Sequence, residues 1–277
     1  MPSYSSHGDR LQYDERGEGV PVVVLGGGPA RHPDYLGDLG GLGRRLRLVV
    51  PHLRGIGGSP LPDDRTRASW WSQAEDVEAL REHLGLAALT VLGHSAGCRI
   101  ALAYATRFPD SLERLVLVTP PASGLVEAED DVQAIRARRT GEPAFDAALS
   151  TALQGPPADA DDDALNAWQR SIAPLSYARW DDPQRRHAAT GPWSVRAVAA
   201  YDSVPVPPTF TTDLAWIAAP VRVVTGGEDG IVGTAAPTAL AGVVPDGAVL
   251  QVEGAGHYPW VDRPEEFAAA ASDALAG

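Results

Sequence analysis

The chain has 277 residues, 44% of them hydrophobic, which is enough to bury a sizeable core as one domain or as one domain with an insertion. Its formal net charge of −13 argues against nucleic acid and anionic membrane surfaces as partners. Every one of its 23 basic residues is an arginine, which excludes chemistry through a lysine Schiff base.

The cysteine content and the apolar patterning predict a location. Cys98 is the single cysteine and cannot form an internal disulfide, as suits a reducing compartment. The opening residues lack the charged-then-apolar pattern of a signal peptide, and no apolar run reaches transmembrane length. We therefore expect a cytoplasmic protein.

The first part of the chain alternates short apolar runs with a helical pattern. Residues 10–13 predict an edge strand, and residues 20–25 and 46–51 predict buried strands. Residues 69–84 predict a helix that covers the sheet, because its apolar side chains share one face: Trp70, Ala74, Val77, Leu80 and Leu84.

A glycine-rich loop, residues 26–30, follows the strand predicted at 20–25. Glycines at the carboxyl end of a parallel strand leave backbone N–H groups free to point into a site. One interpretation is a flexible connection. The interpretation we favour is an oxyanion hole, in which Gly28 or Gly27 supplies one N–H and Ala96 the other.

The most informative stretch is Gly93-His94-Ser95-Ala96-Gly97. An apolar strand is predicted before it at residues 89–92, and a helical pattern follows it. The pattern G-x-S-x-G between a strand and a helix is the nucleophile elbow, in which a strained serine stands clear of the sheet. This placement favours Ser95 as a nucleophile over an incidental serine in a glycine turn.

The part of the chain after the strand predicted at residues 115–118 lacks strand patterns. It predicts a helical cap at 122–212, inserted into a core domain made of residues 1–121 and 213–277. Its Trp and Pro content, with few paired charges, predicts an apolar pocket and a role in substrate choice rather than chemistry. The amphipathic fragments that predict its helices are 132–139, 145–153, 165–172 and 195–201.

Strand patterns resume at residues 221–225 and 248–252, and a closing helix is predicted from Pro264. Alternating strands and helices predict an α/β fold, with a mostly parallel central sheet flanked by helices on both faces.

Two loops after these strands supply partners for the predicted nucleophile. A serine hydroxyl needs an adjacent base, and that base needs an anion to fix its tautomer. Asp229 and His257 each follow a strand, so that the chain order is Ser95, Asp229, His257, the order of α/β-hydrolases. Glu228 is the rival acid, but Asp229 lies one residue further into the turn.

Together, the Gly-His-Ser-Ala-Gly elbow, the Gly-rich loop ending in Pro29, Arg54-Gly55-Ile56-Gly57, Asp229 and Gly256-His257 resemble the α/β-hydrolase superfamily, and most of all its proline iminopeptidase-like branch. The resemblance implies the α/β-hydrolase fold, a Ser-His-Asp triad and no cofactor or metal.

The sequence departs from that branch at several motifs. The branch usually has His-Gly-Gly-Pro-Gly, whereas Gly26 and Ala30 stand at the ends of this loop. Its aminopeptidases bind a free amine with cap glutamates near a Trp-Glu pair, and the nearest counterpart here, Trp193-Ser194, lacks the acid. These departures argue against strict proline release.

The leading expectation is therefore a serine hydrolase that cleaves a small ester, amide, thioester or lactone through an acyl-enzyme. The alternatives are a lyase, cyclase or perhydrolase on the same scaffold and, with less support, a non-enzymatic binding protein. An epoxide hydrolase or haloalkane dehalogenase would carry Asp in place of Ser95.

We expect a small-molecule substrate as the partner, bound with help from Trp193, His94 and Trp260. His94 flanks the nucleophile and is also expected to support the elbow. The sequence leaves the oligomeric state open.

Overall fold

The computed structural model describes residues 1–276, which build an eight-stranded sheet in the order β1-β2-β4-β3-β5-β6-β7-β8. From β4 to β8 every neighbouring pair is parallel, whereas β1 and β2 are antiparallel additions at one edge. The mostly parallel sheet is as predicted. The strands are β1 Ser3–Ser6, β2 Asp9–Arg16, β3 Pro21–Leu25, β4 Arg47–Pro51, β5 Leu89–His94, β6 Leu112–Val118, β7 Val221–Gly226 and β8 Gly247–Val252.

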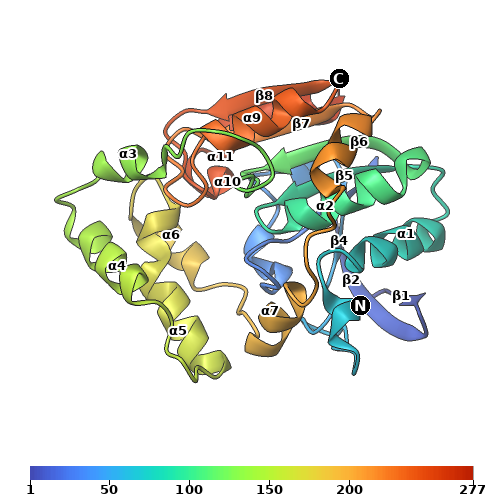
Figure 1. The fold of residues 1–277 in the computed structure, drawn as a ribbon, viewed down its shortest axis with the longest axis horizontal. Coiled ribbons are helices and arrows are strands. Elements are labelled where there is room, and N and C mark those ends of the chain that lie inside the picture. The colour runs from blue at the N-terminus through green and yellow to red at the C-terminus, as the bar shows by residue number, and fades with distance from the viewer. Residues whose placement is uncertain (277) are drawn as a thin grey trace.

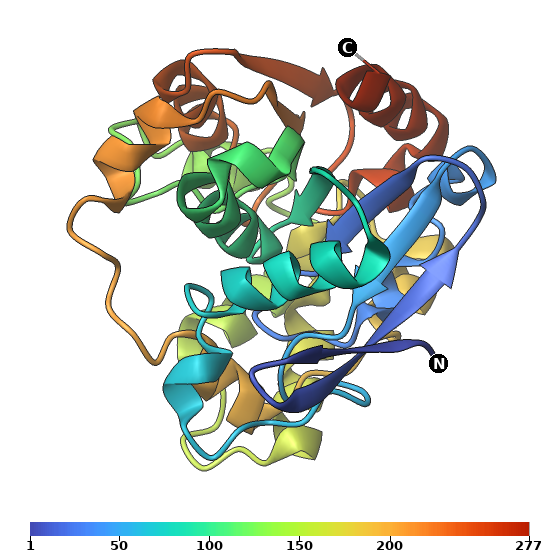
Figure 2. The same cartoon turned by 90° about the vertical axis from the view of Figure 1, so that its right-hand side faces the viewer.

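Helices cover both faces of this sheet (Figure 2). The helices α1 (Gln73–Leu84), α2 (Gly97–Arg107) and α9 (Ala235–Val243) contribute to one apolar cluster with Val23. On the opposite face, α11 (Pro264–Ala276) packs in a second cluster that includes the next strand residue, Val24. Successive strand side chains point to opposite faces, so burial on both faces explains why inner strands such as β3 and β4 are almost continuously apolar.

The segment between β6 and β7 is helical, and among its described residues no strand forms. In Figure 1 the helices α3 to α6 lie together on the left, away from the sheet, as a unit coloured green to yellow. Sequence patterning anticipates four of the helices but not α6 or α8. The helices are α3 Val132–Ala137, α4 Pro143–Gln154, α5 Asp162–Ile172, α6 Asp182–Ala188, α7 Val195–Tyr201 and α8 Phe210–Asp213.

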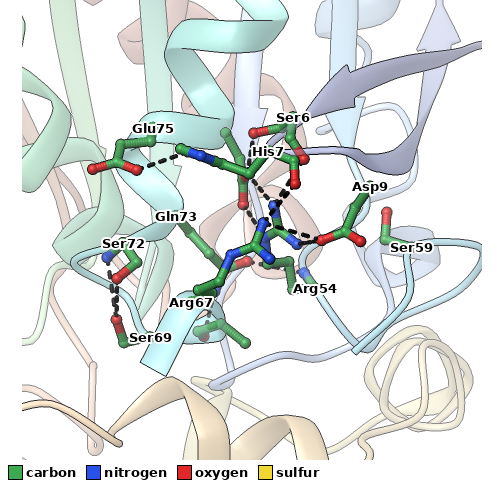
Figure 3. Close-up of polar contacts among 12 residues, drawn as sticks. Ser6, His7, Asp9, Arg54, Ser59, Arg67, Ser69, Ser72, Gln73 and Glu75 are labelled. Atoms are coloured by element: carbon green, nitrogen blue, oxygen red, sulfur yellow. Dashed lines mark hydrogen bonds and ion pairs between the residues drawn. The ribbon is translucent and has the colours of Figure 1, made fainter. Parts of the chain in front are cut away.

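A buried ionic network joins the β1–β2 hairpin to the turn after β4. The Arg54 side chain is only 1% exposed, and its Nε and Nη2 donate to the two carboxylate oxygens of Asp76 at 2.7 and 2.8 Å. Its Nη1 donates to Asp9 at 2.5 Å, and Ser6 Oγ donates to Asp76 at 2.6 Å. Figure 3 shows Arg54 between Ser6, Asp9 and Gln73. Arg54, part of the motif quoted for the family resemblance, therefore anchors the fold.

None of the helices within residues 1–276 has the length and apolar character that crossing a bilayer requires.

Candidate active site

Ser95 stands on a sharp turn between β5 and α2. Its φ of +50° lies in the left-handed region, which is costly for a residue with a side chain, and its N–H donates to the Val118 carbonyl at 2.9 Å. A Cβ added to Gly97 would lie 2.3 Å from the Leu25 carbonyl oxygen, so only glycine fits the first turn of α2. The elbow therefore has the strained geometry that G-x-S-x-G predicts.

The three residues predicted as a triad lie in one hydrogen-bonded line. Ser95 Oγ is 2.8 Å from His257 Nε2, and His257 Nδ1 is 2.9 Å from Asp229 Oδ2. All three are buried, Asp229 completely. Because a carboxylate only accepts hydrogen bonds, the proton of the imidazole resides on Nδ1, and Nε2 accepts from the serine hydroxyl. This is the arrangement in which a histidine can take the serine proton.

The backbone after Asp229 holds its carboxylate in place. Oδ1 accepts from the N–H of Ile231 at 2.8 Å and of Val232 at 3.1 Å, which leaves Oδ2 for His257. The rival acid, Glu228, instead pairs with Arg138 at 3.1 Å, away from the imidazole. The geometry thus gives the two neighbouring acids different partners: Asp229 bonds to His257 and Glu228 to Arg138.

A buried carboxylate that the sequence did not single out fixes the loop carrying His257. Asp262 Oδ2 accepts from the N–H groups of Gly256 and Ala178, each at 2.8 Å, and burial raises the pKa of this carboxyl group. The His257 N–H donates to the Ser176 carbonyl at 2.8 Å. The histidine loop is therefore tied to the helical segment between β6 and β7. An aspartate at the end of a short helical turn gives no sequence signal for this role.

The glycine-rich loop leaves one of the two candidate N–H groups, that of Gly28, without an acceptor among the described residues. The Gly27 N–H donates to Tyr35 Oη at 2.6 Å, which removes Gly27 from the predicted oxyanion hole. Within residues 1–276 no protein acceptor takes the N–H of Gly28 or of Ala96. A Cβ on Gly27 would lie 2.8 Å from Ser95 Cβ, so this loop abuts the nucleophile directly.

His94 is a scaffold residue rather than the predicted substrate contact. It is 1% exposed, its Nδ1 lies 2.8 Å from Tyr35 Oη, and its Nε2 donates to the His257 carbonyl at 3.1 Å. Tyr35 therefore donates to Nδ1 while it accepts from Gly27. Burial, reinforced by the nearby His257, lowers the pKa of His94 well below its ordinary value. The neutral ring thus links the elbow, the glycine loop and the histidine loop.

Trp260 likewise lies in the core. Its ring meets His94 edge-on at a centroid distance of 4.7 Å and packs beside Phe267 of α11. The side chain is 6% exposed and lines a separate surface hollow with Tyr35 and Pro264. Trp260, which was predicted to contact the substrate, does not line the cavity beside Ser95, because the helical turn that starts at Pro259 (α10, Pro259–Asp262) directs the indole into the core.

A cavity of about 210 Å³ opens beside Ser95 and His257. The helical segment contributes Trp193, which was predicted to bind substrate, to its wall. Its lining is largely apolar, as the sequence predicted, and includes Ile172 and Ile231. No cluster of three or more His, Cys, Asp or Glu within residues 1–276 could hold a metal ion.

Residues 20–264 match the family model described as the alpha/beta hydrolase fold. The chain belongs to the α/β-hydrolase family. The structure superimposes on an alpha/beta fold family hydrolase from Bacillus anthracis str. Sterne with a TM-score of 0.76. The match covers 99% of this chain and 98% of the other, at 18% sequence identity. That likeness shows the fold alone.

Curated relatives of this α/β-hydrolase differ in reaction. A soluble epoxide hydrolase of Corynebacterium sp. (strain C12) is 33% identical over 128 residues, which are 45% of this chain and 42% of the relative. A proline iminopeptidase of Lactobacillus helveticus (strain DPC 4571) is 34% identical over 110 residues, 37% of this chain and 36% of the relative. The chain thus matches less than half the length of these relatives. The relatives and the structural neighbour are α/β-hydrolase enzymes, and the resemblance to the proline iminopeptidase branch is confirmed.

Proposed function

We propose that this protein is a serine hydrolase that cleaves small esters, thioesters or lactones through an acyl-enzyme. Ser95 Oγ attacks the carbonyl carbon while His257 Nε2 takes the hydroxyl proton. His257 then gives that proton to the leaving group as the bond to the carbonyl carbon breaks. A water molecule, deprotonated by the same nitrogen, hydrolyses the acyl-enzyme and restores Ser95. Asp229 holds the imidazole and stabilises its positive charge.

The observation that carries this proposal is the continuous line from Ser95 through His257 to Asp229 at 2.8 and 2.9 Å, beside an open cavity. The N–H groups of Gly28 and Ala96 have no acceptor within residues 1–276, so we assign the negative oxygen of the tetrahedral intermediate to them. Donors already in place at the developing charge need no rearrangement during the reaction.

The two reactions named for the curated relatives fit this site less well. An epoxide hydrolysis through an alkyl-enzyme ester would need a carboxylate where Ser95 stands. An aminopeptidase would need an acid near the cavity to receive the free amine of its substrate. None of the described residues that line the cavity is Asp or Glu.

We also propose that residues 122–212 form a cap that shapes the substrate cavity without supplying the reacting groups. In support, Trp193 and Ile172 from this segment line the cavity, while Ser95, Asp229 and His257 lie in the core. A cover of this kind excludes water and selects substrates by shape.

A panel of 4-nitrophenyl acyl esters and aminoacyl 4-nitroanilides tests the proposal, with Ser95→Ala as the blank. We expect turnover of esters that vanishes in Ser95→Ala and exceeds turnover of proline 4-nitroanilide. Preferential cleavage of the proline substrate, lost when its amine is acylated, would contradict the proposed substrate class.

A further inference from the structure

A buried arginine lies in the wall of the cavity beside Ser95. Arg31 is 2% exposed, and its Nε, Nη1 and Nη2 donate to the Gly191 carbonyl at 2.9 Å, Tyr258 Oη at 2.9 Å and the Thr190 carbonyl at 2.6 Å. These oxygens satisfy donors but carry no formal charge. Within residues 1–276 no Asp or Glu pairs with it. The cavity wall therefore holds a positive charge without a counter-ion among these residues. Such a buried charge is costly until an anion pairs with it.

An indole N–H without an acceptor lies next to this charge. Trp193 Nε1 is buried and has no hydrogen-bond partner among the described residues. A Cβ added to Gly28 would lie only 2.9 Å from that nitrogen, so the N–H lies at the glycine loop that lines the cavity. The guanidinium carbon of Arg31 is 4.2 Å from the centroid of the Trp193 ring. An unused donor and a cation thus occupy the same part of the wall.

The charge of the cavity is opposite to that of the whole molecule. The chain carries a formal net charge of −13, yet among the described lining residues the only permanently charged side chain is Arg31. Much of the lining around it is apolar, as at Ile172, Ala173 and Ile231. In such surroundings the attraction of one charge for an anion is stronger than it is in water.

We propose that the substrate carries a carboxylate, which accepts a hydrogen bond from Trp193 Nε1 and is attracted by Arg31. This inference rests on the proposed function, since it names the substrate class of the same site. The ester would be one whose acyl part ends in a carboxylate, such as a monoester of a short dicarboxylic acid. The acid released by hydrolysis would then be a dicarboxylate.

Two esters of equal length test the proposal: mono-4-nitrophenyl adipate, and the matching compound in which a primary amide replaces the free carboxylate. A hydrogen bond to a charged group contributes about 1.5–3 kcal/mol, so we expect kcat/KM at least about tenfold higher for the carboxylate ester. In Trp193→Phe this preference should shrink, because the ring stays and the N–H is lost. Trp216→Phe, at a tryptophan that is 81% exposed, should keep the full preference.

Arg31→Met should remove the preference as well, but Arg31 also joins the Gly191 region to the glycine loop, and this variant can fail to fold. The effect of Trp193→Phe on the preference for the carboxylate ester is therefore the deciding test. Equal kcat/KM for the two esters in the wild-type protein, or an equal loss for both in Trp193→Phe, would overturn the proposal.

Binding to Ser95→Ala gives a readout that does not depend on turnover. Calorimetry with monomethyl adipate and with its primary amide should show tighter binding of the carboxylate by at least about tenfold. Tighter or equal binding of the amide overturns the carboxylate site even if Ser95 is a working nucleophile. Tighter carboxylate binding without hydrolysis of any ester would instead support the site and contradict the proposed hydrolysis.

Discussion

At the scale of single residues, hydrogen-bond direction decides what each group of the site can do. Asp229 fixes the His257 proton on Nδ1, and the His257 carbonyl, which only accepts, fixes the His94 proton on Nε2. The order of Ser95, Asp229 and His257 along the chain was enough to predict that they meet. The choice between Gly27 and Gly28 was not predictable, because it depends on where the Tyr35 hydroxyl lies after folding.

The two neighbouring acids give a sharp comparison. Asp229→Asn should lower kcat on the order of 10⁴-fold, because the asparagine amide would stabilise the wrong histidine tautomer. Glu228→Gln should change kcat little, because Glu228 pairs with Arg138 at the surface. Steady-state kinetics on a 4-nitrophenyl ester measures both variants. A larger loss in Glu228→Gln would mean that the acid has been misassigned.

Tyr35→Phe tests the link between the elbow and the glycine loop. The Gly27 N–H and His94 Nδ1 would both lose their partner, and we expect kcat to fall by about tenfold with little change in KM. The matched control is Tyr104→Phe, which also removes a hydroxyl, one that donates to Glu78. It should lower stability by a similar amount and leave kcat unchanged. An equal fall in kcat in both variants would contradict a positioning role for Tyr35.

At the scale of elements, apolar periodicity predicts what packs on the sheet and misses what is held by polar contacts. The strands β3 to β8 and the helices α1, α2 and α11 are recognisable because each buries an apolar face. The helix α6 is not, because its sequence, Asp-Pro-Gln-Arg-Arg-His-Ala, has no apolar stripe. It is fixed instead by a capping box at Asp181 and by Gln184 donating to Asp262 at 2.9 Å.

The Arg54 network predicts that replacing Arg54 destabilises the protein more than replacing Arg47. Arg54→Met would leave the buried Asp76 carboxylate without its cation, at a cost of about 3–5 kcal/mol in the free energy of unfolding. Asp9 is half-buried and would keep its pair with Arg67. Arg47→Met removes an exposed pair with Glu15 and should cost at most about 1 kcal/mol. Urea unfolding followed by circular dichroism measures both. Similar midpoints for the two variants would show that the network does not anchor the hairpin.

At the scale of the whole molecule, the buried His94 and the half-buried His187 make stability depend on pH because both are held neutral. Burial, with the Arg31 charge nearby, lowers the pKa of His187 to about 3, and burial lowers that of His94 too. Below pH 6.5 the unfolded chain therefore binds protons that the folded protein does not, so the free energy of unfolding falls as pH falls. Each histidine contributes a slope of at most about 1.4 kcal/mol per pH unit.

Thermal unfolding between pH 7.5 and 5.5, above the ordinary range of carboxylates, checks this dependence. We expect Tm to decrease toward the lower pH in the wild-type protein. In His187→Gln the decrease should be smaller, because glutamine does not titrate and unfolding of the variant takes up one proton fewer. An unchanged slope in the variant would mean that His187 is not held neutral in the folded protein.

The central claim is that Ser95 is a nucleophile activated by His257. Labelling with a fluorophosphonate probe, followed by peptide mass spectrometry, tests it most directly. The account predicts a single modified residue, Ser95, with labelling abolished in Ser95→Ala and slowed by several orders of magnitude in His257→Ala. Equal labelling of the wild-type protein and both variants, or modification at another residue, would contradict it.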